Sequence, residues 1–127
     1  MINETRPKTI FCDIDGTLIH HMKPNETMNP NAKMKLLPGA LNKLLEWERL
    51  GYTIILTSGR RNSARRQTER QLEEAGIVYD QLVMGFGGGK RYIINDRKPY
   101  GDEDYAVAIN IERNYGIKDL ELWYTKN

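Results

Sequence analysis

The stretch FCDIDGTL, residues 11–18, decides the fold of this chain. It places two carboxylates, Asp13 and Asp15, one residue apart at the end of an apolar run that begins near residue 8. Two like charges this close repel each other, so a structural site would rarely contain them. The pattern predicts a strand over residues 8–14 that carries a functional site at its carboxyl end.

The segments outside this stretch alternate between helix and strand patterns. Helices are expected over residues 40–50 and from Asn62 or Ser63 to about Gly76. Residues 52–57 form a continuous apolar run typical of a central parallel strand, and further strands are expected over residues 77–84 and 92–95. Residues 105–111 fit a strand or a helix. The order predicts an α/β fold, namely a three-layer α/β/α, doubly wound, mostly parallel sheet with right-handed crossovers.

Length and composition limit the class of protein. The 127 residues fit a single domain over residues 1–127, and a formal net charge of +2 does not by itself indicate nucleic-acid binding. Cys12 is the single cysteine, so no internal disulfide forms, and we interpret it as a buried, inert thiol. The absence of a secretory leader and of a long apolar run predicts a cytoplasmic protein without a membrane span.

Polar residues follow three of the expected strands. Active sites of doubly wound sheets lie beyond the carboxyl ends of the strands. There the chain offers Asp13 and Asp15, then Thr57-Ser58-Gly59-Arg60, and then Asn95-Asp96. Three aspartates around one point favour a cation, and oxygen ligands favour Mg²⁺. The structural alternative is that each acid caps a helix or a turn.

These motifs resemble those of the haloacid dehalogenase (HAD) superfamily of phosphatases. The matching stretches are DIDGT (residues 13–17), IILTSGR (54–60) and IIND (93–96). The resemblance implies that Asp13 is a nucleophile that forms an aspartyl-phosphate, and that Asp15 is the general acid and base. It also implies Mg²⁺ held by Asp13, Asp96 and the main-chain carbonyl of Asp15, with Ser58 and nearby backbone N–H groups binding the phosphoryl oxygens.

The family also has a lysine that balances the carboxylates. If residues 92–95 run parallel to the first strand, Lys98 lies at the active-site edge and Lys90 at the opposite end of that strand. We therefore favour Lys98 over Lys90 for this role. The alternative for Lys98 is a solvated surface lysine.

Neither insertion point of the family carries a cap domain here. Residues 18–37 are long enough only for a flap, with His20 and His21 interpreted as solvated loop residues, and residues 85–89 form a short glycine-rich link. The sequence thus predicts a small, capless member with an open site. A neighbouring subunit is a further way to close that site.

Three functions follow from these features. The leading prediction is a Mg²⁺-dependent phosphatase acting on a sugar phosphate or another small phosphorylated metabolite. Arg60, next to Gly59 at an expected helix start, would contact substrate phosphate. The SGR element and Asp96-Arg97 also resemble the phosphatase domains of polynucleotide kinase-phosphatases, so a polynucleotide 3′-phosphatase is the alternative, although no aromatic stacking platform is evident. A non-catalytic phosphate- or partner-binding module is the alternative of another class, and it would not need Asp15.

Overall fold

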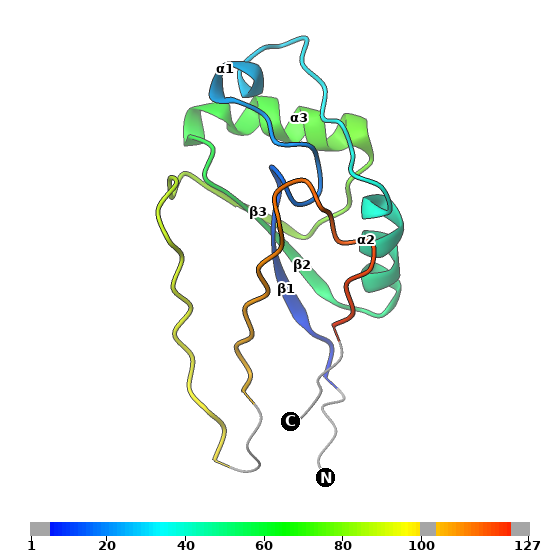
Figure 1. Ribbon diagram of the computed structural model, residues 1–127, viewed down its shortest axis with the longest axis vertical. Coiled ribbons are helices and arrows are strands. Elements are labelled where there is room, and N and C mark those ends of the chain that lie inside the picture. The colour runs from blue at the N-terminus through cyan, green and yellow to red at the C-terminus, as the bar shows by residue number, and fades with distance from the viewer. Residues whose placement is uncertain (1–5, 100–103, 123–127) are drawn as a thin grey trace.

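A three-stranded parallel sheet forms the centre of the computed structural model, which describes residues 6–99 and 104–122 (Figure 1). The strands are β1 (Thr9–Asp13), β2 (Thr53–Ser58) and β3 (Gln81–Met84), in the order β1-β2-β3. The register pairs Asp13 with Thr57, and Ser58 with Met84. All three strands therefore end at one edge of the sheet, where the sequence predicts the site.

Two helices cover one face of this sheet. They are α2 (Ala40–Arg49) and α3 (Arg65–Ala75), which the short 3-10 helix η1 (Asn62–Ala64) precedes. Both crossovers step in the same direction along the sheet, so right-handed connections place both helices on the same side. Leu44 and Trp47 of α2 and Leu72 of α3 share one apolar core with the buried β2 residues Ile54 and Leu56. No helix in residues 6–99 and 104–122 has the length and apolar character that crossing a bilayer requires.

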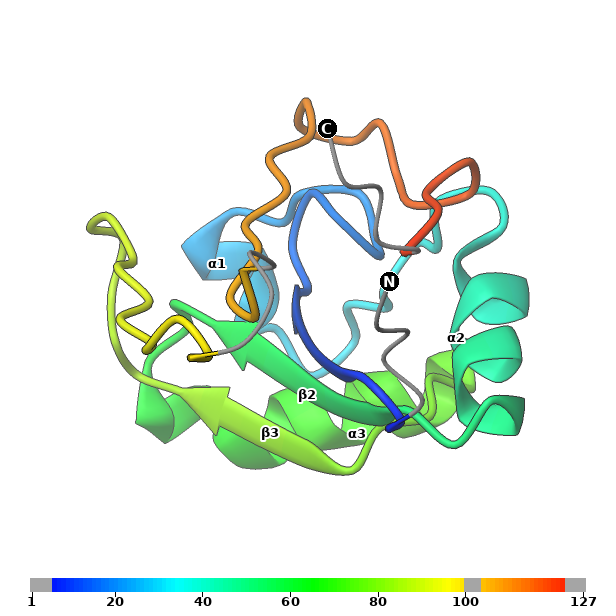
Figure 2. The ribbon, with the colours of Figure 1, turned by 90° about the horizontal axis from the view of Figure 1, so that it is seen from below.

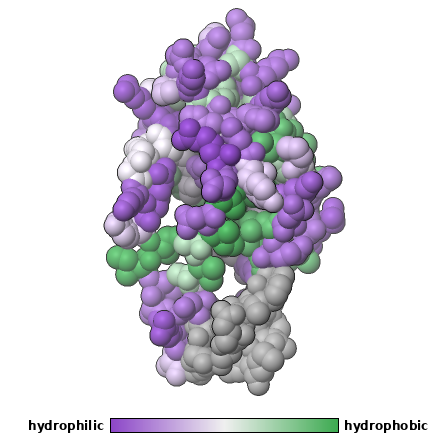
Figure 3. All heavy atoms as spheres, viewed as in Figure 1, coloured by the Kyte–Doolittle hydropathy of each residue, from purple (hydrophilic) through white to green (hydrophobic). Residues whose placement is uncertain are grey.

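The opposite face of the sheet is much more open. Phe11 is 61% exposed and Val83 44% exposed, whereas Cys12, Ile54 and Leu56 on the helix-facing side of the strands are buried. Two extended segments, residues 85–99 and 104–111, lie on the side of the sheet away from α2 (Figure 2). Apolar atoms gather across the middle of the face seen in Figure 3, below a polar upper half. The residues described here therefore build one helical layer on the sheet, and extended chain lies where the second helical layer of the expected α/β/α arrangement would be.

The strand expected over residues 92–95 is not formed, so that prediction is wrong. Residues 85–99 are extended and leave the carboxyl end of β3 towards the opposite end of the sheet (Figure 1). A parallel strand needs a crossover of about a dozen residues or more, but the link between Met84 and Tyr92 is shorter. The chain therefore runs antiparallel to β3, and Tyr92 and Ile94 stay 82% and 95% exposed. Residues 105–111, which fitted either element, adopt neither a helix nor a strand.

The flap over residues 18–37 is fixed at its base and at its tip. At the base, Ile19 forms an antiparallel bridge with Leu36, and the Leu37 N–H donates to the Leu18 carbonyl at 2.9 Å. The tip contains the short helix α1 (Pro24–Thr27) and rests on α3. Three α3 side chains donate to flap carbonyls: Gln67 to Asn29, Arg70 to Pro30 and Gln71 to Ala32. The flap is therefore held against the rest of the fold by hydrogen bonds at both its base and its tip.

Asn114 connects the turn after Asp15 to the C-terminal segment. Its N–H donates to the Gly16 carbonyl at 2.8 Å, and its side-chain oxygen accepts from the His21 N–H at 2.8 Å. It is also the one non-glycine residue with a positive φ, 65°, in the part of the chain that is described. Asparagine tolerates this left-handed conformation better than most residues. Asn114 thus holds the turn and the start of the flap together.

We expect Asn114→Ala to lower the free energy of unfolding by about 1–3 kcal/mol, because it combines a strained φ with an unpaired His21 N–H. Asn114→Gly removes the backbone strain but also leaves the His21 N–H unpaired, so it should lower the free energy of unfolding by less than Asn114→Ala does. Urea denaturation of both variants measures the difference. Equal stability of the wild type and Asn114→Ala would show that this connection contributes nothing.

Candidate active site

Asp13 is the last residue of β1 and points to the open face of the sheet. The Thr17 hydroxyl donates to its Oδ2 at 3.2 Å, so the DIDGT turn folds back on the carboxylate. Burial of the carboxyl group raises the pKa of Asp13, and the nearby charge of Asp15 raises it further. The hydrogen bonds from Thr17 and the Ile14 backbone and the charge of Arg91 lower it. Because the residue itself is exposed, solvent screens these effects.

A tight turn carries the chain from Asp13 to Asp15. Gly16 has a φ of 86°, a conformation that glycine adopts without strain. The N–H groups of Thr17 and Leu18 both donate to the Ile14 carbonyl, at 3.1 and 2.9 Å. Ile14 itself is fully buried, so the turn is anchored in the core between the two aspartates. This arrangement separates the two carboxylates in direction although they are neighbours in sequence.

A bidentate ion pair with Arg60 holds the Asp15 carboxylate. Arg60 Nε donates to Asp15 Oδ2 and Nη2 donates to Oδ1, both at 2.8 Å. The Arg60 side chain is 4% exposed and that of Asp15 17%. A fork-to-fork pair of this kind fixes the plane of the carboxyl group and the direction in which its remaining lone pairs point. The remaining lone pairs of Asp15 stay free to meet a substrate atom.

The other side of the Arg60 guanidinium is bound by α3. Its Nη1 donates to the Thr68 hydroxyl at 3.0 Å and to Gln71 Oε1 at 2.8 Å, and both of these residues are fully buried. This geometry therefore does not provide the expected contact between Arg60 and substrate phosphate. The side chain points inward because α3 offers two buried acceptors opposite Asp15. Arg60 therefore orients the Asp15 carboxylate from the buried side that faces α3.

Ser58 and Gly59 form the turn that leads from β2 into Arg60. The Ser58 hydroxyl oxygen accepts the Arg60 N–H at 3.0 Å, and Ser58 is buried on the helix-facing side of β2. Thr57 pairs with Asp13 in the register, so its side chain lies on the same side of the sheet as the nucleophile candidate. Ser58 thus shapes the turn, and its contact with phosphoryl oxygens stays a prediction.

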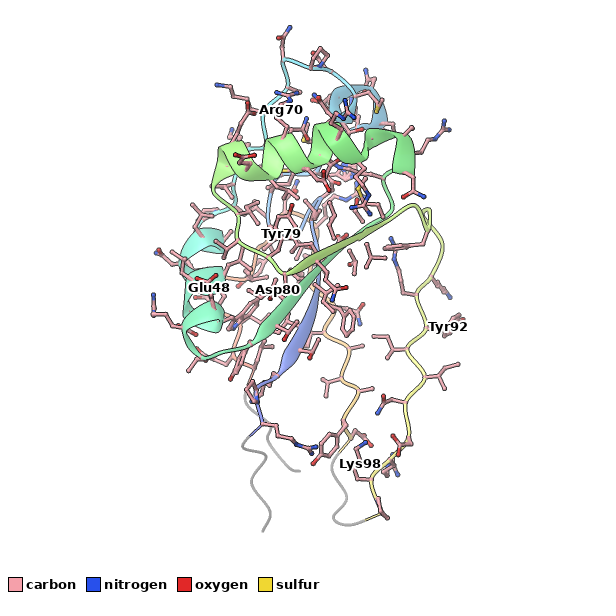
Figure 4. All side chains as sticks on the ribbon, turned by 180° about the vertical axis from the view of Figure 1, so that it is seen from behind. Glu48, Arg70, Tyr79, Asp80, Tyr92 and Lys98 are labelled. Carbon is pink, nitrogen blue, oxygen red and sulfur yellow. The ribbon has the colours of Figure 1, made fainter. Side chains whose placement is uncertain are left out.

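The structure does not bring Asp96 or Lys98 to this site. Lys98 lies beyond the amino end of β1, at the opposite end of the molecule from α3 (Figure 4). Its Nζ is 3.3 Å from Asp96 Oδ1, and that carboxylate is exposed. The preference for Lys98 over Lys90 assumed that this segment runs parallel to β1. Because the segment runs the other way, its beginning lies next to the site. The cation of this segment that lies nearest the site is therefore Arg91, which follows Lys90.

The donor set fits a hard cation only in part. Among the residues in the described ranges, no three His, Cys, Asp or Glu side chains come together as a metal site. Among the described residues Asp13 forms no ion pair within 4 Å and accepts a hydrogen bond from Thr17, whereas both oxygens of Asp15 bind Arg60. Mg²⁺ is typically bound through one or two carboxylates, with waters and substrate phosphate completing its shell. Asp13 fits the role of one such carboxylate ligand of Mg²⁺.

Four residues of the site are not predicted by the sequence: Thr68, Gln71, Arg91 and Asn114. Thr68 and Gln71 are polar residues on the buried side of α3, next to Leu72, and polar groups at such positions require buried partners. Arg91 was overlooked beside Lys90. Asn114 precedes Tyr115-Gly116, a pattern typical of a turn. The first and last of these signals were readable, but their partners were not.

Comparisons with known proteins agree with this architecture. The family model of the polynucleotide kinase PNKP phosphatase domain (HAD_PNKP) matches residues 7–101. A chain in the structure of the Pnkp1/Rnl/Hen1 complex is 32% identical with a TM-score of 0.55, over 71% of this chain and 32% of that chain. A chain in the structure of the Pnkp1/Rnl/Hen1 RNA repair complex is 34% identical with a TM-score of 0.53, over 65% of this chain and 27% of that chain.

A crystal structure from Vibrio cholerae shares the fold, with a TM-score of 0.51 and 19% identity over 72% of this chain and 81% of that chain. A search of curated proteins gave no match.

The fold and the site define a phosphatase of the HAD superfamily, as the sequence motifs predicted. Within that class, the chain belongs to the family of polynucleotide kinase phosphatase domains, whose model covers most of it. The predicted α/β fold with a parallel sheet and the predicted hydrolase of the phosphomonoesterase type are both confirmed, and residues 6–99 contain no inserted cap domain. The chain spans only about a third of the length of the first two matched structures, at 32% and 27%.

Proposed function

We propose that this chain removes the terminal phosphate from the 3′ end of a polynucleotide. The observation that supports it best is the match to polynucleotide kinase phosphatase domains over residues 7–101, which contain Asp13, Asp15 and Arg60. This function was the alternative in reasoning from the sequence. The phosphatase acting on a small metabolite now ranks second, because the two matched structures at 32% and 34% identity are both of Pnkp1/Rnl/Hen1 complexes.

The chemistry would begin with attack of the Asp13 carboxylate on phosphorus. An O–P bond forms to Asp13 while the bond to the 3′ oxygen breaks, and Asp15 gives that oxygen its proton. Asp15, now ionised, takes a proton from water, and the resulting hydroxide attacks phosphorus. The Asp13 carboxylate is released together with inorganic phosphate. The bidentate pair with Arg60 holds Asp15 in one orientation through both steps.

Mg²⁺ is the cofactor that we propose, with Asp13 and the main-chain carbonyl of Asp15 as its protein ligands. When bound, it would neutralise the phosphate and the carboxylate that attacks it. The role of Asp96 as a metal ligand stays a prediction from the sequence, because its exposed carboxylate pairs with Lys98. Calorimetric titration of Asp96→Ala with Mg²⁺ decides its role, since weakened affinity would mean that the extended segment reaches the site.

The basic start of α3 offers a surface for the polynucleotide. Arg61, which directly precedes η1, and Arg66 in the first turn of α3 are both exposed next to the SGR turn. Arg65 and Arg70 have local partners instead, Glu69 and Glu74, and Arg70 also holds the flap. A strand whose 3′ end enters the site would therefore meet Arg61 and Arg66 first. Binding through such charges weakens as salt rises.

We expect kcat/KM for a 3′-phosphorylated oligonucleotide to exceed that for sugar phosphates and for a 5′-phosphorylated oligonucleotide of the same sequence. A difference of at least about tenfold corresponds to about 1.4 kcal/mol in transition-state binding. Phosphate release with Mg²⁺ present measures all three. The 5′-phosphorylated strand controls for general attraction to nucleic acid, because it carries the same charge at the wrong end.

The matched variants for this test are Arg66→Ala and Arg49→Ala. Arg49 is an exposed arginine in the last turn of α2, away from the SGR turn. Arg66→Ala should raise KM for the oligonucleotide and leave a sugar phosphate unaffected, and Arg49→Ala should change neither. Faster turnover of a sugar phosphate than of the 3′-phosphorylated strand would reject the proposal and restore the small-metabolite reading.

A further inference from the structure

The guanidinium of Arg60 has all of its hydrogen-bond donors in use. A guanidinium carries five N–H groups in a fixed plane. Here they meet five acceptor atoms, which belong to Asp15 (two oxygens), Thr68, Gln71 and Met22. A group held on every side has one orientation, and the position of each acceptor helps to determine it. Two of these acceptor residues connect Arg60 to the flap over residues 18–37.

Met22 is the direct connection and Gln71 the indirect one. The Met22 sulfur, in the flap, lies 3.4 Å from Arg60 Nη2. Gln71 belongs to α3, and its Oε1 accepts from Arg60 Nη1 at 2.8 Å, while its Nε2 donates to the Ala32 carbonyl of the flap at 3.4 Å. Gln71 is fully buried, and a buried amide needs partners for both of its ends. The Gln71 side chain therefore bridges the flap and the guanidinium.

The flap determines which end of the Gln71 amide faces Arg60. A carbonyl only accepts hydrogen bonds and a guanidinium only donates them. With the amide reversed, its NH₂ group would face the N–H groups of Arg60, and its oxygen would face the Ala32 carbonyl. Both contacts would then be repulsive. The Ala32 carbonyl thus selects the orientation in which the Gln71 oxygen binds Arg60.

The Ala32 carbonyl is held in place by neighbouring contacts of the same kind. Gln67 and Arg70, also on α3, donate to the flap carbonyls of Asn29 and Pro30. The tip of the flap consequently rests along α3 (Figure 1). An alteration of Gln71 should leave these contacts in place, so the effect of its amide can be measured separately from attachment of the flap.

We infer that Gln71 is a positioning residue for the general acid Asp15. Anchored by the flap, its amide fixes the Arg60 guanidinium, and Arg60 in turn holds both oxygens of the Asp15 carboxylate at 2.8 Å. A rotation of the guanidinium would turn the carboxylate away from the leaving oxygen. The inference rests on the role proposed above for Asp15, but it does not depend on the substrate being a polynucleotide.

A comparison of leaving groups tests this role. An alkyl phosphate ester needs protonation of its leaving oxygen, whereas 4-nitrophenyl phosphate needs it much less. Gln71→Leu removes both amide contacts and should lower the ratio of the two kcat values, alkyl over nitrophenyl, by about tenfold, which is part of the roughly 100- to 10,000-fold that acid–base catalysis contributes. Both rates come from one preparation, so the folded fraction cancels in the ratio. An unchanged ratio would overturn the inference.

Gln67→Leu is the matched control. Gln67 is the same residue type on the same helix and also donates to a flap carbonyl, but its other partner is Arg70. Its loss should leave the ratio of kcat values unchanged. An equal fall in Gln67→Leu and Gln71→Leu would assign the effect to a loosened flap and contradict the inference. Asp15→Asn tests the underlying mechanism: if its ratio does not fall, the proposed acid role fails, and if only Gln71→Leu keeps the wild-type ratio, only this inference fails.

Two milder variants test the direction of the amide. Gln71→Glu keeps an oxygen for Arg60, but its second oxygen faces the Ala32 carbonyl and its charge competes with Asp15 for the guanidinium. It should therefore not restore the ratio. Gln71→Asn has both amide ends on a side chain one carbon shorter, cannot reach both partners, and should also lower the ratio, which keeps the test open if Gln71→Leu does not fold. A wild-type ratio in either variant would overturn the inference.

Discussion

Asp13→Asn should abolish phosphate release, by at least about 1,000-fold in kcat, because an amide cannot attack phosphorus. The same substitution should stabilise the protein. Burial and the neighbouring Asp15 raise the pKa of Asp13, which means that its charged form is disfavoured in the fold. A raised pKa costs stability as pH rises from the usual carboxyl range through the folded value. The gain in melting temperature should therefore be present at neutral pH and vanish in acid.

Asp15→Asn is the paired variant that defines the mechanism. It should be nearly as damaging to steady-state turnover, because the amide neither protonates the leaving oxygen nor accepts a proton from water. With a good leaving group such as 4-nitrophenolate, the first step needs less acid help, so an aspartyl-phosphate should accumulate and be trapped in acid. Release at the wild-type rate by Asp13→Asn would reject Asp13 as the nucleophile, whatever Asp15 does.

Local patterns were sufficient for the elements that build the sheet. The apolar run before Asp13 and the run over residues 52–57 correspond to β1 and β2, and the glycines after two helix patterns mark where α2 and α3 end. These features depend on residues close in sequence, where strand and helix periodicities are readable. The edge that carries Asp13, Asp15 and the SGR turn followed directly from strand order.

The direction of the segment after β3 was not read correctly, although its cause is simple. IIND looks like an apolar strand that ends in an acid, and this similarity outweighed the length of the link before it. A link of that length is shorter than the dozen or so residues that a crossover between parallel strands needs. The positions inferred for Asp96, Lys98 and Lys90 all depended on that one assumption. The short crossover is itself a sequence feature, and it conflicts with a parallel strand over residues 92–95.

Side-chain direction was beyond what the sequence offers. Arg60 stands where a substrate contact is expected, and its inward orientation depends on Thr68 and Gln71 of α3 facing Asp15 across the core. Such long-range matches of donor and acceptor arise from packing of separate elements and leave no local pattern. Arg91 is similar, because its guanidinium lies beside Gly59 through a hydrogen bond to the Gly87 carbonyl, which itself approaches Gly59 closely.

Arg60→Ala is expected to produce the largest loss of stability among the variants considered. It leaves the Asp15 carboxylate, the Thr68 hydroxyl and the Gln71 side chain without their common partner in a buried site. Removing one member of a buried ion pair costs about 3–5 kcal/mol, because the remaining charge stays desolvated. For a chain of this size the melting temperature should fall by about 10 °C or more. Thermal unfolding without substrate is the measurement.

The exposed pair of Arg97 with Asp104 provides a matched control. Its N–O distance is 2.8 Å, the same as that of Arg60 with Asp15, but its side chains are 71% and 58% exposed. Arg97→Ala should therefore cost at most about 1 kcal/mol. Similar losses for Arg60→Ala and Arg97→Ala would show that burial adds nothing to the Arg60 pair.

The catalytic consequence of Arg60→Ala separates positioning from folding. Assayed well below its melting temperature, the variant retains Asp13 but holds Asp15 loosely, so its defect should resemble that of Asp15→Asn. The loss in kcat should be large for an alkyl phosphate ester, whose poor leaving group needs the acid, and smaller for 4-nitrophenyl phosphate. Arg60→Lys keeps the charge without the fork and should recover only part of both stability and rate. A loss equal for both leaving groups would mean that Arg60 supports the fold alone and does not aim Asp15.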